Sequence, residues 1–79
     1  MEKTIYSPSY RALIGRLRSA RIERGLRQDQ VARMLSVSRQ WLSHVETCQI
    51  RIDVLQLVSW CQALGLDAPD LVRMLEEGR

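Results

Sequence analysis

Four side chains that form directional hydrogen bonds cluster in one short stretch of the chain: Arg39, Gln40, Ser43 and His44. The guanidinium of Arg39 offers two parallel N–H donors that match the O6 and N7 acceptors of guanine. The amide of Gln40 can pair in the same bidentate way with N6 and N7 of adenine. Such a set of side chains is suited to hydrogen bonding with base edges. The alternative interpretation is that these residues only form the solvated face of a helix.

The same stretch is a poor candidate for catalysis or metal binding. His44 is the only histidine, no nucleophile and orienting carboxylate accompany it, and the sequence contains no glycine-rich phosphate loop. Cys48 and Cys61 lie 13 positions apart and form no C-x-x-C pair, which leaves too few ligands for zinc. We therefore expect reduced thiols, no enzymatic activity, no metal and no cofactor.

Helical spacing predicts how these side chains are presented. Ser38 is a good N-cap for a helix over residues 39 to about 47, in which Leu42 and Val45 face inward. Because successive helical residues lie about 100° apart, the four polar side chains must then face outward.

Two further helices are expected before this one. The first begins at Ser7 and Pro8, an N-cap followed by proline at the first helical position, and ends at Gly25. The second covers residues 28–35 and starts poorly, because Arg27 stands where Ser, Thr or Asp would form a cap.

Two helices are expected after it. Asp53 caps the fourth helix, Gly65 closes it, and Asp67 opens the fifth. The fourth carries an apolar stripe of Val54, Leu57, Val58, Cys61 and Leu64. Five short helices predict an all-α fold, with one domain over residues 9–76 between tails at 1–8 and 77–79.

The second and third helices form a helix-turn-helix pattern within the segment QDQVARMLSVSRQWLSHVETC, residues 28–48. About three residues separate them. Ala32 is small where the two helices must cross closely, and Val37 is apolar where a turn residue can bury in the angle between them.

On four segments the sequence resembles the lambda-repressor-like, or Cro/repressor, helix-turn-helix family of the xenobiotic-response-element type. The segments are LRSARIERGL (17–26), QDQVARML (28–35), SVSRQWLSHVE (36–46) and LVSWCQALGL (57–66), and the resemblance covers roughly residues 10–75. It implies a compact five-helix DNA-binding domain whose helices 2 and 3 form the helix-turn-helix.

The resemblance also implies roles for individual positions. Those that match base contacts in the major groove are Arg39, Gln40, Ser43 and His44. Those expected to contact DNA phosphates are Gln28, Ser38, Trp41 and Arg51. Arg21 and Glu46 resemble a largely buried ion pair between the first helix and the end of the recognition helix; the alternative is a surface pair, which contributes little.

Trp41 and Trp60 each have two interpretations. The indole of Trp41 either lies against the DNA backbone, where family members commonly carry a small hydroxyl residue, or folds over the edge of the core. Trp60 is expected in the core or on a dimer surface.

The sequence departs from the family at two helix ends. Glycine is usual at the positions of Ser36 and Cys48, and a side chain in left-handed geometry costs about 1–2 kcal/mol. We therefore expect these turns to be reshaped. The proline common near Ile52 is also absent.

Charge is unevenly distributed along the 79 residues. Residues 1–51 carry ten Lys or Arg and four acidic residues, whereas residues 52–79 carry two Arg and five acidic residues, so the net charges are +6 and −3. A basic part of this kind favours a polyanionic partner, although ordinary solvated charge is the alternative. No apolar run approaches the roughly 18–20 residues that span a bilayer, and residues 1–7 do not resemble a signal peptide, so a cytoplasmic location is expected.

From these observations we expect a sequence-specific transcriptional regulator, a repressor, that binds double-stranded DNA as a homodimer. One short helix reads few base pairs, whereas two copies about 34–36 Å apart read a palindromic operator. The expected dimer interface consists of Leu66, Leu71, Val72, Met74 and Leu75. The alternative is that these residues only complete the core of the monomer.

Two other functional classes are weighed against this one. An antitoxin would neutralise a partner toxin with its acidic C-terminal part and autoregulate its operon through the helix-turn-helix; only about 13 residues follow Leu66 for that purpose. A protein-interaction module would have kept the fold and lost DNA binding, which Gln28, Arg39 and Gln40 argue against.

Overall fold

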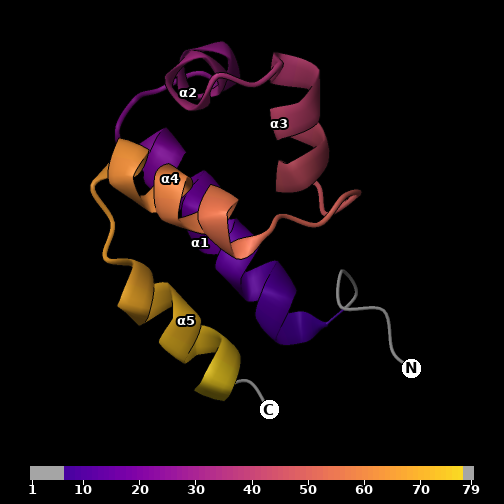
Figure 1. Cartoon of the computed structure of the whole chain (residues 1–79), viewed down its shortest axis with the longest axis vertical. Coiled ribbons are helices and arrows are strands. Elements are labelled where there is room, and N and C mark those ends of the chain that lie inside the picture. Colours follow the sequence, from indigo (N-terminus) through magenta and orange to yellow (C-terminus); the bar gives the residue numbers. More distant parts are fainter. Residues whose placement is uncertain (1–6, 78–79) are drawn as a thin grey trace.

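The protein is built from five α-helices, seen in a computed structural model that describes residues 7–77 (Figure 1). They are α1 (Pro8–Glu23), α2 (Gln28–Leu35), α3 (Arg39–Glu46), α4 (Val54–Leu64) and α5 (Ala68–Glu77), and no strand occurs in this range. The all-α prediction is therefore confirmed. Pro8 and Glu77, expected in the tails, are helical, and the remaining tail positions, 1–6 and 78–79, lie outside the described residues.

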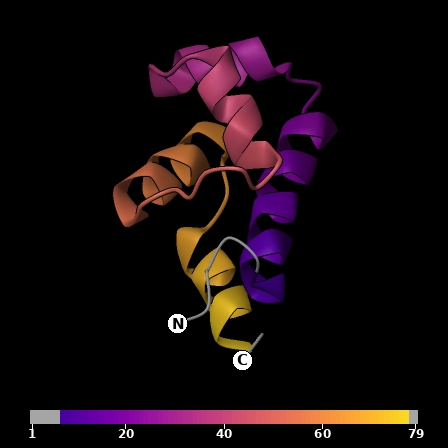
Figure 2. The same cartoon turned by 90° about the vertical axis from the view of Figure 1, so that its right-hand side faces the viewer.

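The helices are arranged along one long axis. The pair α2 and α3 occupies one end, α4 crosses in front of α1, and α5 lies beside α1 toward the other end (Figures 1 and 2). Because α3 contacts both α1 and α2, its orientation is fixed by helices on two sides.

Side-chain caps begin three helices where the sequence predicts them. The hydroxyl of Ser7 accepts a bond from the Tyr10 amide at 3.4 Å. Ser38 Oγ accepts from the Trp41 amide at 3.0 Å, and the Asp53 carboxylate accepts from the Gln56 amide at 2.7 Å. Each bond satisfies a backbone donor that the helix itself cannot pair.

A side chain inside the helix, rather than one at the N-cap position, stabilises the start of α2. Arg27 provides no cap of its own, but Gln30 Oε1 accepts a hydrogen bond from the Arg27 amide at 2.7 Å. The residue three positions into the helix thus supplies the polar partner that the N-cap position lacks.

Each helix contributes apolar side chains to one core, and α4 buries a different face from the one predicted. Ala32 is 2% exposed, as close helix crossing requires. On α4 the buried residues are Leu57, Trp60, Cys61 and Leu64, whereas Val54 is 74% and Val58 37% exposed. The stripe prediction was wrong for these two valines, because placing the larger Trp60 inside buries more apolar area than either valine would.

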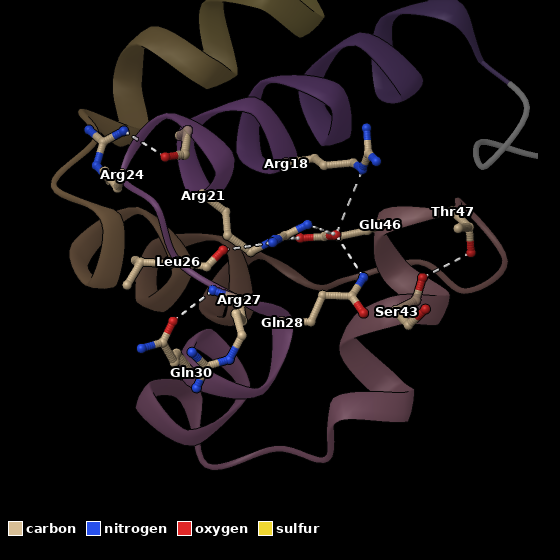
Figure 3. Close-up of polar contacts among 11 residues, drawn as sticks. Arg18, Arg21, Arg24, Leu26, Arg27, Gln28, Gln30, Ser43, Glu46 and Thr47 are labelled. Atoms are coloured by element: carbon tan, nitrogen blue, oxygen red, sulfur yellow. Dashed lines mark hydrogen bonds and ion pairs between the residues drawn. The ribbon is translucent and has the colours of Figure 1, made fainter.

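A buried ion pair joins α1 to the end of α3 (Figure 3). Arg21 donates from Nε to Glu46 Oε2 at 2.7 Å and from Nη2 to Glu46 Oε1 at 3.0 Å. A third donor, Nη1, bonds the Leu26 carbonyl at 2.8 Å, so the same guanidinium also holds the connection between α1 and α2. The Glu46 side chain is only 1% exposed, which distinguishes this bidentate pair from a surface contact.

The two non-glycine turns keep left-handed geometry, with φ of 58° at Ser36 and 59° at Cys48. The expectation that they are reshaped was wrong. In each turn a backbone bond closes the helix end: the Val37 amide donates to Ala32 O at 3.0 Å, and the Gln49 amide donates to His44 O at 2.8 Å. These bonds satisfy terminal carbonyl groups and offset the conformational strain.

Ser36→Gly should stabilise the protein by about 0.5–1 kcal/mol, because relief of left-handed strain exceeds the added entropy of the unfolded chain. Thermal unfolding should show a rise in Tm of a few degrees. Cys48→Gly is the control: its φ is equally positive, but the side chain is 8% exposed and its buried contacts are lost, so no gain is expected. A lower Tm for Ser36→Gly would contradict this explanation.

Glu46→Gln should lower the free energy of unfolding by about 3 kcal/mol, because Arg21 remains buried without a countercharge. The matched control is Asp70→Asn, which removes the exposed ion pair with Arg73 at 2.8 Å and should cost less than about 1 kcal/mol. Urea denaturation measures both values. Equal losses would show that burial does not set the contribution of the Glu46 pair.

Candidate nucleic-acid interface

The outward face of α3 carries the four side chains singled out from the sequence. Arg39 and Gln40 are exposed in its first turn, and Ser43 and His44 are half-buried one turn later. On the opposite face Leu42 and Val45 are fully buried. The helix therefore cannot rotate without exposing apolar surface, and its polar face stays toward solvent.

Gln28, at the first position of α2, contacts the buried carboxylate that anchors α3. Its Nε2 donates to Glu46 Oε1 at 3.0 Å, the oxygen that also accepts from Arg21 (Figure 3). An amide nitrogen carries two N–H groups, so one remains able to donate to an acceptor outside the protein. A phosphate oxygen is such an acceptor.

Arg18, to which the sequence assigns no role of its own, lies on the other side of the same carboxylate. Its Nε is 4.0 Å from Glu46 Oε1, and its side chain is 58% exposed (Figure 3). Arg18 precedes Arg21 by three residues, and residues three apart share a helix face. This three-residue spacing from Arg21 is the sequence signal that could have identified Arg18. The arrangement places a cation next to Gln28 at the edge of the helix-turn-helix.

Two further candidates for phosphate contact, Ser38 and Arg51, lie away from the Glu46 carboxylate. Ser38 and Arg51 are exposed at either end of the recognition helix region. The loop that carries Arg51 is tied to α1, because the Ile52 amide donates to the Tyr10 hydroxyl at 3.3 Å. Burial is the largest cause of a raised pKa at Tyr10.

Trp41 packs at the edge of the core. It is half-buried, and its ring centroid lies 6.2 Å from that of Trp60 at an interplanar angle of 37°. Trp60 is fully buried. Trp41 therefore packs at the core edge, as one of its two interpretations holds, while its contact with the DNA backbone stays a prediction; Trp60 lies in the core rather than on a surface.

Arg27 and Asp29 form an exposed ion pair at the start of α2, with Nε and Oδ1 3.0 Å apart. The hydrogen bond from Arg27 is the largest cause of the lowered pKa of the Asp29 carboxyl. This carboxylate lies in the first turn, where the helix dipole favours negative charge.

The cysteines are both free and buried, and burial raises the pKa of the Cys61 thiol. Within residues 7–77 no group of three His, Cys, Asp or Glu side chains is close enough to hold a metal ion. Among the helices described, none combines the length and apolar composition that a membrane crossing requires.

Of the five residues predicted for a dimer interface, one is buried in the protomer's own core and three are partly buried against it. Leu71 is 3% exposed, and three others pack against the core: Leu66, Met74 and Leu75. Only Val72, at 41%, is among the exposed large hydrophobic residues. Four of the five thus contact the monomer's own core, as the alternative weighed from the sequence holds, and their role in a dimer interface stays a prediction.

Known proteins similar to this chain are also helix-turn-helix proteins. The family model described as a helix-turn-helix domain matches residues 12–75. An XRE-family like protein from Pseudomonas syringae pv. tomato str. DC3000 is 31% identical, with a TM-score of 0.81 over 94% of this chain and 90% of that one. The clp gene regulator ClgR from C. glutamicum is 30% identical, with a TM-score of 0.74 over 84% of this chain and 86% of that one.

No curated protein sequence matches the chain. The family match nevertheless spans α2, α3 and most of the other helices, and both solved structures share the fold over most of this chain. This chain belongs to the XRE-type, lambda-repressor-like family of helix-turn-helix DNA-binding proteins.

Proposed function

We propose that the protein is a sequence-specific transcriptional repressor that reads the major groove of double-stranded DNA with α3. The observation that carries the proposal is the exposure of Arg39 and Gln40 in the first turn of a helix whose other face is fully buried. Their side chains suit bidentate contacts to guanine and adenine. The structural similarity to a protein described as a gene regulator supports a regulatory role.

Backbone contacts would fix the register of α3 on the duplex. Gln28 and Arg18 flank Glu46, the first through a hydrogen bond and the second through an ion pair, and both carry N–H groups that could donate to phosphate oxygens. Ser38 and Arg51 would add contacts at the two ends of the recognition helix region, and Ser43 and His44 would reach bases from its second turn. Trp41, whose ring packs on Trp60, would contact the backbone only with the exposed part of its half-buried side chain.

Repression is the simplest outcome of such binding. A domain that fills the major groove prevents other proteins from using the same base pairs and needs no contact with the transcription machinery. Two copies on a palindromic operator would double the number of base pairs read.

The antitoxin alternative gains no support from the fold. The acidic C-terminal segment forms α5, which packs against α1, and Leu71 is buried there. A toxin-binding role would require this segment to leave the core or to act through its exposed face alone.

Arg39→Ala should weaken binding to the preferred duplex by about 1–3 kcal/mol and relax the preference at one base pair. Fluorescence anisotropy against duplexes that vary at single positions measures both effects. Arg73→Ala removes the same charge on α5, far from α3, and serves as the control (Figure 1). Equal losses on all sequences would assign Arg39 to the phosphate backbone.

Gln28→Ala should weaken binding by a similar factor on every duplex, because a phosphate contact carries no sequence information. Affinity of the unaltered protein should fall steeply as salt rises, since phosphate contacts release bound counterions. A changed sequence preference in Gln28→Ala would contradict its proposed role. Failure to bind any duplex at low salt would contradict the function itself.

A further inference from the structure

A hollow of about 150 Å³ lies between the helix-turn-helix and α4. Figure 1 shows α2 and α3 on the same side of α4. Apolar side chains from the end of α2, the turn, α3 and α4 line the hollow: Leu35, Val37, Trp41, Leu55 and Trp60. An apolar cavity of roughly that volume accommodates benzene. The hollow therefore has the size of one aromatic ring.

The wall of this hollow contains a buried hydrogen-bond donor without an acceptor. Trp60 is fully buried, and within residues 7–77 its Nε1 is the one buried side-chain nitrogen or oxygen that has no hydrogen-bond partner. A buried indole N–H ordinarily has an acceptor, because burial removes the hydrogen bond that it forms with water. A bound molecule that carries an acceptor would restore this bond.

Two polar side chains at the hollow are already engaged with each other. Gln56 Oε1 accepts from the Asp53 amide at 2.9 Å, and Asp53 Oδ1 accepts from the Gln56 amide at 2.7 Å. These bonds hold the start of α4, so breaking one to satisfy Trp60 would uncap the helix. The acceptor for Trp60 therefore has to come from outside this pair.

Aromatic walls favour an aromatic occupant. The rings of Trp41 and Trp60 have centroids 6.2 Å apart and are tilted by 37°. Aromatic rings attract one another in offset-stacked and edge-to-face arrangements at such separations. The mouth of the hollow is open to solvent, since Leu55 and Ser59 are exposed, so a small molecule can enter.

The charges around the hollow favour an uncharged occupant. The exposed carboxylate of Asp53 lies at its edge and would repel an anion. A cation would meet apolar side chains and the N–H donor of Trp60 inside. Moving either charge from water into such surroundings is unfavourable.

We propose that this hollow binds a compact, uncharged aromatic molecule whose acceptor receives the hydrogen bond of Trp60 Nε1, and that the molecule is an effector of DNA binding. The effector role rests on the proposed function, whereas the binding site does not. The ligand would contact Val37 in the turn and Trp41 on α3, so it stabilises the arrangement in which α3 presents Arg39 and Gln40. A ligand that prefers this arrangement raises the affinity for DNA, because the two binding equilibria are linked.

Titration of the full chain with phenol tests the site. Phenol is uncharged and carries one acceptor oxygen on an aromatic ring, and a dissociation constant of about 1 mM is expected of so small a ligand. In ¹H–¹⁵N correlation spectra the Trp60 indole N–H signal should move downfield and saturate; Trp41→Phe assigns the two indole signals. A Trp60 signal that does not respond would overturn the proposal, as would one that changes with protein concentration alone, which would assign the hollow to a second copy.

Toluene and benzoate are the matched control ligands. Toluene has the size of phenol but no acceptor, so it should bind more weakly and leave the Trp60 proton without a downfield shift. A merely apolar hollow gives the opposite order, because removing the phenol hydroxyl from water is unfavourable when it finds no partner. Benzoate carries a negative charge and should not bind. Tighter binding of toluene than of phenol would contradict the role of Trp60.

Substitutions on α4 locate the site. Ser59→Phe places a ring at the mouth of the hollow and should abolish the saturable shift, whereas Gln62→Phe adds the same ring at an exposed α4 position that does not line the hollow and should bind phenol normally. Trp60→Phe should remove the preference for phenol over toluene, measured on the ligands' own proton signals. Circular dichroism checks the fold of each variant. Equal phenol binding by Ser59→Phe and Gln62→Phe would place the ligand elsewhere.

DNA binding separates this inference from the proposed function. Saturating phenol should raise the affinity for duplex DNA about fivefold, at the lower end of usual coupling between sites, in the unaltered protein and in Gln62→Phe but not in Ser59→Phe. Unchanged affinity would overturn the effector role. If the protein binds no duplex at low salt although Trp60 responds to phenol, the proposed function is wrong and the site stands. If it binds DNA and Trp60 does not respond, only this inference is wrong.

Discussion

The buried carboxylate of Glu46 is the contact on which the DNA-facing surface depends. It lies at the end of α3 and accepts hydrogen bonds from Arg21 on α1 and Gln28 on α2. A charge taken out of water is tolerated only when it is paired and hydrogen-bonded. Any rotation of α3 relative to the other two helices would break this pairing. We infer that the cluster contributes more to the orientation of the recognition helix than to net stability.

Apolar packing also fixes the orientation of α3, together with the ion pair of Glu46. Leu42 and Val45 bury the inner face of α3, and Ala32 allows α2 to approach closely. The left-handed residue Ser36 is retained at the turn between them despite its conformational cost. The turn is therefore held by its surroundings, so local strain there does not loosen the angle between the helices. A rigid angle is what allows Arg39 and Gln40 to be presented at fixed positions.

Local signals in the sequence predicted where helices start. They could not predict which face of α4 is buried or where the C-terminal leucines lie, because tertiary packing determines both. Ser7, Ser38 and Asp53 identify helix starts because capping is a local interaction. The buried face of α4 was ambiguous, since two stripes share Leu57, Cys61 and Leu64, and only the packing of Trp60 inside selects one. The C-terminal leucines suit a core or an interface equally well in sequence. Their placement depends on α5 packing on α1, which no local pattern reveals.

Sequence reading by this protein requires that α3 be held rigidly with Arg39 and Gln40 directed at base edges. Selection of bound duplexes from a random pool tests it most directly, because it assumes no operator. Selection should enrich an inverted repeat with half-sites centred about 10–10.5 base pairs apart. A pool that stays random after selection with folded protein at low salt would contradict it.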